Sequence, residues 1–194
     1  MPPGPIELPA SSDIEAWLVE KSQGTALLDG FQSVAADLSE AEAALCEAYQ
    51  AGLLGRDARL RREGQTAVSE MYRDFAALVG RSSVGYPLVC YRALSFVDIP
   101  TGADELIVER ALSSWSLYPS VALRTGLVTG AASPVALIAC RLLPNEPSLY
   151  LDEFEHEVVR TEQLRMRELD SVTGQVYFMG EHIDIVLLSA EIAP

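Results

Sequence analysis

The segment Leu151-Asp-Glu-Phe-Glu-His-Glu-Val-Val-Arg160 reads as a loop that runs into a buried strand. Two of its carboxylates, on Glu155 and Glu157, stand two residues apart where that strand begins. Because residues i and i+2 of a strand point to the same face, both acids can face one cleft. The alternative is an acidic pair on a solvated strand edge, since charged side chains mostly lie at the surface. The residues upstream decide between the two interpretations.

Length and composition indicate one globular domain over residues 1–194. The chain is 49% hydrophobic and 22% charged, a balance typical of a folded protein with a hydrophobic core. Its net charge of −14 includes no basic stripe, so we do not expect it to bind nucleic acid through the phosphates. The cysteines Cys46, Cys90 and Cys140 form no Cys-x-x-Cys pair, and we predict that they are buried free thiols.

The chain divides into three stretches of different character. Residues 1–11 are rich in proline and predict an extended arm, residues 12–80 carry helical patterns, and residues 86–190 are β-rich. A helix over 119–129, with proline in its first turn, interrupts the β-rich stretch. Helices followed by strands indicate an α+β fold and not an alternating α/β fold.

Capping and turn signals place the elements. Ser12-x-x-Glu15 and Ser39-x-x-Glu42 match the capping box that opens a helix. Apolar spacing predicts further helices over 27–38 and 57–79, and Thr173-Gly174 predicts a turn between two strands. The predicted strands are Leu88–Leu94, Leu106–Val108, Arg110–Leu117, Val135–Leu142, Glu157–Arg160, Leu164–Leu169, Gln175–Met179 and Ile183–Leu188.

Polar side chains interrupt two of these strands. Arg92 lies inside an apolar run, where a buried guanidinium needs an anion or a carboxylate. Its planar fork suits a phosphate clamp, and a structural ion pair is the alternative. Ser114 and Ser116 share one face of the predicted strand Arg110–Leu117, while Trp115 takes the other face. Such serines also form ordinary local hydrogen bonds.

In this order the three features resemble the R-S-E class of mono-ADP-ribosyltransferases, in its arginine-type Glu-x-Glu form. Arg92 lies 22 residues before Ser114, which lies 43 residues before Glu157. Tyr91-Arg92 matches the family's aromatic-Arg start. Ser114-Trp-Ser-Leu-Tyr-Pro-Ser-Val-Ala122 is similar to its Ser-Thr-Ser-Leu-x-Pro-x-x-Ala segment, and Glu155-His-Glu-Val-Val159 to its Glu-x-Glu-Val-Leu segment. The resemblance implies an α+β fold whose helical N-terminal half packs on a mixed or antiparallel β-sandwich core.

The resemblance also implies NAD as co-substrate and assigns roles to the motif residues. Glu157 would hold the ribose 2′-hydroxyl and stabilise the oxocarbenium-like transition state. Arg92 would bind the pyrophosphate, and Ala93, where many relatives carry glycine, would offer its backbone groups beside the nicotinamide amide. Ser114 would orient Glu157 and the ribose, with support from Ser116.

The acceptor side of the implied site begins with Glu155. In this family a glutamate at that place goes with arginine acceptors, because a carboxylate attracts the guanidinium and helps it lose a proton. Residues 145–154 would form the loop that meets the acceptor protein. His156 is expected to point away from both acids, as is Trp115, which replaces the usual threonine. Tyr118 would either stack near the nicotinamide or pack in the core.

Two interpretations from other classes stay open. One is a catalytically silent ADP-ribosyltransferase-like domain that only binds, and the other is a structural or assembly protein, such as a phage component. A metal enzyme is disfavoured, because two histidines and unclustered cysteines offer poor ligand spacing. No signal peptide or membrane span is apparent, so we expect a cytoplasmic protein with no membrane partner. Specialised export or phage injection and a nucleic-acid acceptor stay open without support from the sequence.

Overall fold

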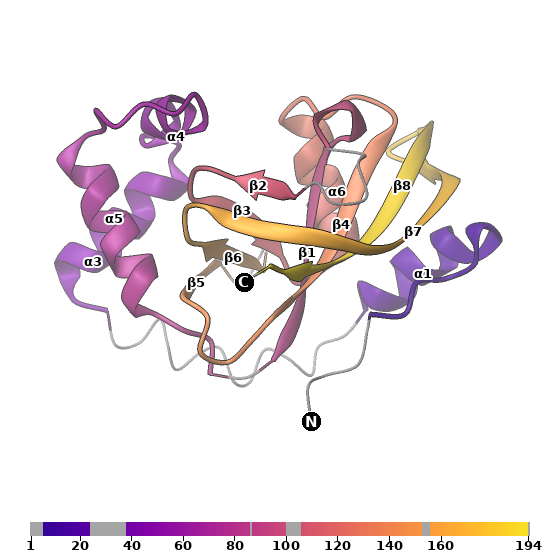
Figure 1. Ribbon diagram of the computed structural model, residues 1–194, viewed down its shortest axis with the longest axis horizontal. Helices are drawn as coiled ribbons and strands as arrows, with labels where there is room; N and C mark the ends of the chain where they lie inside the picture. Colours follow the sequence, from indigo (N-terminus) through magenta and orange to yellow (C-terminus); the bar gives the residue numbers. More distant parts are fainter. Residues whose placement is uncertain (1–5, 24–37, 86, 100–105, 153–155, 194) are drawn as a thin grey trace.

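The computed structural model describes residues 6–23, 38–85, 87–99, 106–152 and 156–193. Within these residues eight strands form one mixed sheet in the order β2-β7-β8-β4-β1-β3-β6-β5 (Figure 1). β4 and β8 pair in parallel, and the other neighbouring strands are antiparallel. The strands are β1 (Leu88–Ser95), β2 (Ile107–Glu109), β3 (Ser113–Ser116), β4 (Val135–Leu142), β5 (Ser148–Asp152), β6 (Glu157–Arg160), β7 (Leu164–Phe178) and β8 (Glu181–Ile192).

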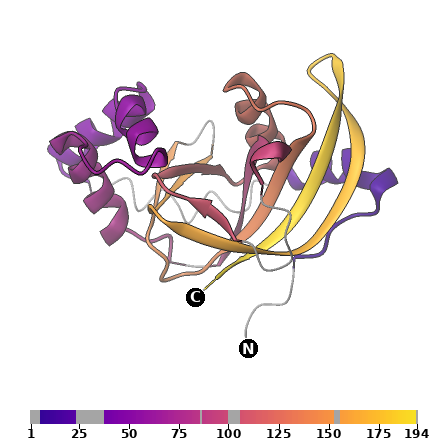
Figure 2. The ribbon, with the colours of Figure 1, turned by 45° about the horizontal axis from the view of Figure 1, so that its top comes forward.

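One face of this sheet closes over the central core. Buried residues of β1, β4 and β8, such as Cys90 and Ile138, meet buried residues of β2, β3 and β6, such as Ile107, Trp115 and Val158. All of them lie on the same face of the sheet according to the strand register, and Figures 1 and 2 show the bend that brings the two halves together. The predicted sandwich is therefore one continuous, strongly bent sheet.

Helices cover the outer face of the sheet in two groups. In the described part of the chain they are α1 (Ile14–Lys21), α3 (Glu40–Gln50), α4 (Gly55–Arg62), α5 (Glu70–Arg81) and α6 (Pro119–Val128). α1 and α6 pack on the half built from β1, β4, β7 and β8. α3 and α5 form a separate apolar cluster with Leu112, Leu149 and Val159 of the other half. None of the helices in the described ranges is long and apolar enough to cross a membrane.

The predicted helix over 57–79 is wrong, because the chain turns in its middle. Gly64 adopts a left-handed conformation with φ of 82°, which ends α4. Ser69 then caps α5, its hydroxyl accepting the backbone N–H of Tyr72 at 3.1 Å. The Asp57 carboxylate accepts both the backbone N–H and the hydroxyl of Ser69, so the break is fixed by side chains from both helices.

The two predicted capping boxes have different outcomes. The box at Ser39 is present in full, and its hydrogen bonds from Ser39 lower the pKa of Glu42 to about 2. The box at Ser12 is wrong, because Ser11–Asp13 form a 3-10 turn and α1 begins at Ile14 without a side-chain cap. Of the helix predicted over 27–38, residues 27–37 lie outside the described ranges, and Leu38 packs against the α3–α5 cluster.

Two strand predictions also need correction. Thr173-Gly174 is not a turn, since β7 continues through it to Phe178. A Cβ on Gly174 would lie 2.7 Å from the Ile14 side chain, so glycine here lets the N-terminal segment approach the strand. The predicted loop over 145–154 contains β5, whose Leu149 and Tyr150 pack in different apolar clusters. Burial on both faces explains why no polar alternation marks this strand.

Cys46, Cys90 and Cys140 are buried free thiols, as predicted. Burial raises the pKa of Cys90 to about 12.

Candidate active site

A cleft opens where β1 and β3 separate. These strands share a single registered pair, Tyr91 opposite Ser116, whereas β1 pairs with β4 along its whole length. Beyond this pair lies a cavity of about 440 Å³. Its lining from β1, β3 and β6 includes Arg92, Ala93, Ser114, Ser116 and Glu157. The split in the sheet therefore brings together five of the residues that the sequence assigned to the site.

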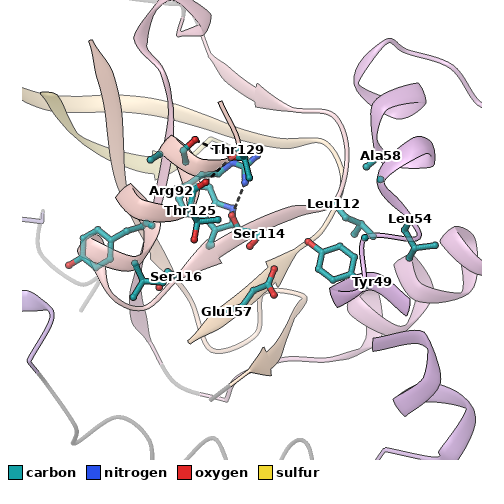
Figure 3. Close-up of a pocket in the computed structure, with 18 of the residues that line it drawn as sticks. Tyr49, Leu54, Ala58, Arg92, Leu112, Ser114, Ser116, Thr125, Thr129 and Glu157 are labelled. Atoms are coloured by element: carbon teal, nitrogen blue, oxygen red, sulfur yellow. Dashed lines mark hydrogen bonds between the residues drawn. The ribbon is translucent and has the colours of Figure 1, made fainter. Parts of the chain in front are cut away.

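α6 forms one wall of the cavity because it packs very closely on β1. A Cβ on Gly126 would lie 2.6 Å from the Cβ of Ala93 and 3.0 Å from its carbonyl oxygen. Only glycine allows this approach, since carbon atoms normally pack at about 3.5–4.0 Å. The contact directs Thr125 and Thr129 to the cavity that Ala93 also lines (Figure 3).

Arg92 is held by two acceptors of the protein. Its Nε donates to Oε1 of Glu109 on β2 at 2.5 Å, and its Nη1 donates to the carbonyl oxygen of Ser114 at 2.7 Å. The ion pair is largely buried, with 14% of the Arg92 side chain and 9% of the Glu109 side chain exposed. The structural ion pair considered from the sequence is thus present, and the same guanidinium also lines the cavity.

Glu157 begins β6 and lies opposite Ser116 in the sheet. It shares the outer face with Ser114 and Ser116, so one face supplies a carboxylate and two hydroxyls to the cleft. The Ser116 hydroxyl accepts the backbone N–H of Tyr118 at 3.1 Å, which joins the end of β3 to the start of α6.

Tyr49 of α3 reaches Glu157 from the opposite wall. Figure 3 shows the Tyr49 hydroxyl and the Glu157 carboxylate pointing toward one another. Burial raises the pKa of Tyr49, and so do the charge of Glu157 and the hydrogen bond between the phenol and that carboxylate. The ring stacks on Phe75 of α5 with centroids 4.6 Å apart. A phenol buried in this way stays protonated and donates to the carboxylate.

The remaining predicted residues lie elsewhere. Tyr118 is buried next to the cavity, with its ring centroid 4.4 Å from that of His156, and does not belong to the described lining. Nδ1 of His156 lies 3.3 Å from the hydroxyl of Tyr150. The Trp115 side chain packs in the central core, and Trp115 also belongs to the cavity lining, so the prediction that it lies apart from the cleft is only partly met. Glu155 lies outside the described residues.

Comparison with known proteins gives structural relatives but no relatives by sequence. No family model and no curated protein matches the chain. Enzymatic component C2-I of the Clostridium botulinum C2 toxin has a TM-score of 0.69 at 11% identity, over 89% of this chain and 48% of C2-I. BECa, an ADP-ribosylating toxin of C. perfringens solved with NADH, has 0.65 at 8% identity, over 92% and 48%. C3larvin, an ADP-ribosyltransferase of Paenibacillus larvae, has 0.58 at 12% identity, over 87% and 95%.

This chain has the fold of the ADP-ribosyltransferase toxins. It spans about half the length of C2-I and BECa and nearly the whole of C3larvin. The bent sheet with its split between β1 and β3 is therefore an ADP-ribosyltransferase fold, and the α+β class predicted from the sequence is confirmed.

Sequence reasoning missed several residues that line the cleft of this ADP-ribosyltransferase fold. The sequence gave no site role to four residues that line the cavity, which are Tyr49, Arg62, Thr125 and Thr129. Arg62 belongs to α4, where four arginines fall within seven residues of an acidic chain. That concentration of positive charge is the one signal in the sequence that marks this wall. The Tyr49 position shows no such signal, because its contact with Glu157 joins segments more than 100 residues apart.

Proposed function

We propose that the chain is a mono-ADP-ribosyltransferase that cleaves NAD and transfers ADP-ribose to an arginine side chain of a protein. The observation that carries this proposal is that Arg92, Ser114 and Glu157 line one cavity in a fold shared with ADP-ribosylating toxins. The order Arg, Ser-x-Ser, Glu-x-Glu adds the resemblance to the R-S-E class.

In the proposed reaction the bond between the nicotinamide nitrogen and the ribose carbon breaks, and its electron pair stays with nicotinamide. The ribose becomes oxocarbenium-like, as in glycoside transfer, and the Glu157 carboxylate stabilises the positive charge. Tyr49 fixes that carboxylate from the opposite wall by donating a hydrogen bond. Arg92 binds the pyrophosphate, for which a guanidinium is well suited.

The acceptor step requires a deprotonated guanidinium. Glu155 is proposed to attract the arginine and to take its proton as the new bond to the ribose carbon forms. The resemblance to the Glu-x-Glu group supports this assignment, since glutamate at this place accompanies arginine acceptors. The acceptor protein is to be identified by its labelling with ADP-ribose.

The test is incubation of the purified protein with NAD labelled in the adenylate part, together with a bacterial lysate and, separately, agmatine as a small guanidino acceptor. We expect labelled protein bands and labelled agmatine, both abolished in Glu157→Gln. Free nicotinamide without labelled acceptor would refute the transfer to arginine but retain NAD cleavage. Binding of NAD without release of nicotinamide would favour the catalytically silent domain, and no binding would favour a structural protein.

A further inference from the structure

Glu109 occupies a position where the strand pattern calls for an apolar side chain. In β2 the side chains alternate, with Ile107 5% exposed in the central core and Val108 44% exposed at the surface. Glu109 follows with 7% exposed, so it faces inward on the same side as Ile107. A buried carboxylate is costly unless it is paired, and at this position it has Arg92.

The pair fixes the orientation of the Arg92 guanidinium. Glu109 accepts from Nε and the Ser114 carbonyl accepts from Nη1, two different nitrogens of one rigid plane. Acceptors at two points, together with the side-chain stem, leave that plane little freedom to rotate. Of the five N–H donors, the protein uses these two in the described part of the chain. Nη2 and the second hydrogen of Nη1 are left for a ligand in the cavity that Arg92 lines.

We propose that Glu109 is a positioning residue for NAD. With the Ser114 carbonyl it holds the Arg92 guanidinium so that the remaining donors meet the pyrophosphate. This inference rests on the proposed function, because it takes the pyrophosphate of NAD as the ligand of Arg92. Nothing in the motif assigns Glu109 a role, since it lies between the arginine strand and the serine strand.

Two other roles would give different results. If the ion pair only stabilises the fold, changes at Glu109 lower the free energy of unfolding without affecting ligand binding. If Glu109 instead competes with phosphate for the guanidinium, removing its charge strengthens ligand binding. If Glu109 positions the guanidinium, the length of the side chain at residue 109 matters more for ligand binding than its charge. Glu109→Gln keeps an acceptor at the same reach, whereas Glu109→Asp keeps the charge and withdraws it by one methylene.

The experiment measures ADP-ribose binding by calorimetry and NAD hydrolysis by nicotinamide release. We expect Glu109→Asp to weaken ADP-ribose binding about tenfold, the scale of one lost charge-assisted hydrogen bond, and to raise KM for NAD with kcat within about twofold. Glu109→Gln should bind ADP-ribose within about threefold of wild type. Glu162→Gln is the control, because it breaks the ion pair of Arg61 and Glu162, neither of which lines the cavity.

Normal ADP-ribose affinity in Glu109→Asp would overturn the inference, and so would tighter binding in Glu109→Gln. Absence of binding to the wild type would overturn the proposed function and this inference together. If the wild type binds ADP-ribose and Glu109→Asp binds it equally well, only the inference about Glu109 is overturned.

A measurement on the wild type keeps the test independent of variant folding. The ¹⁵N NMR signal of the Arg92 Nε–H, assigned with Arg92→Lys, is followed during titration with ADP-ribose. Positioning predicts that Nε stays hydrogen-bonded in the complex while Nη2 shifts. Loss of the Nε hydrogen bond on binding would show competition and overturn the inference.

Discussion

Gly126→Ala tests how α6 forms the wall of the cavity. The added Cβ would lie 2.6 Å from the Cβ of Ala93 and 3.0 Å from its carbonyl oxygen, so α6 must move away from β1 by about 1 Å to restore normal contact. Overpacking of this kind costs about 1–3 kcal/mol. The helix propensity of alanine offsets about 1 kcal/mol of that loss, which would blur the result of a single variant.

Gly80→Ala in α5 is the matched control. Gly80 also lies in a helix, and a Cβ added there meets nothing within 4 Å. Because both variants gain the propensity of alanine, their difference isolates the clash. Gly126→Ala should therefore be less stable than Gly80→Ala by about 1–3 kcal/mol, a difference in Tm of about 2–12 °C for a chain of this size.

The assays are thermal unfolding and ADP-ribose binding. Movement of α6 displaces Thr125 and the backbone of Ala93, so Gly126→Ala should also weaken ADP-ribose binding, whereas Gly80→Ala should not. The double variant Ala93→Gly/Gly126→Ala removes the shortest contact and should recover much of that affinity. If Gly126→Ala were as stable as Gly80→Ala and bound ADP-ribose normally, the close packing of α6 on β1 would be refuted.

Three further predictions concern the acids and the phenol. Glu157→Gln should slow NAD cleavage at least about a hundredfold while ADP-ribose still binds; nicotinamide release within tenfold of wild type would contradict its role. Tyr49→Phe should slow NAD cleavage about tenfold and change stability by less than about 1 kcal/mol, because the ring still stacks on Phe75; unchanged kcat would remove the phenol from the mechanism. The hydrogen bond to Arg61 lowers the pKa of Glu162 in the folded state. The ion pair therefore stabilises the folded protein at pH values above the ordinary glutamate pKa, and this stabilisation is lost as pH falls through the lowered folded-state pKa. Glu162→Gln should therefore cost about 1–2 kcal/mol at pH 7 and progressively less below pH about 4 in denaturant titrations, and a cost independent of pH would rule out the ion pair as its cause.

The sequence predicted the residues that carry local signals. The box at Ser39 was found because both partners lie within one helical turn. The sequence marked three site candidates, Arg92, Ser114 and Glu157. Each is a polar residue within an apolar strand or at its start, and their order resembles that of a known family. Polar residues within apolar strands can be recognised from the sequence alone, because a buried charge is costly unless it is paired.

The contacts that complete the site depend on the tertiary fold and were not predicted. Glu109 falls between the two predicted strands Leu106–Val108 and Arg110–Leu117, so the sequence did not mark it as facing inward, whereas the structure places it in β2 beside Arg92. Gly174 resembled a turn residue because the approach of Ile14 is invisible in sequence. β5 was taken for a loop because its two faces are buried against different clusters.

The position of Tyr49 connects the helical layer to the acid on β6. α3 and α5 are anchored on β5, β6 and the start of β3 through an apolar cluster, and the Arg61–Glu162 pair joins α4 to the loop after β6. These contacts hold the helices and the strand that begins with Glu157 together. On the other side of the cavity, α6 packs closely on β1 through Gly126, which lies against Ala93. The cavity lies between these two groups of elements, and Tyr49 meets Glu157 there from the helical side.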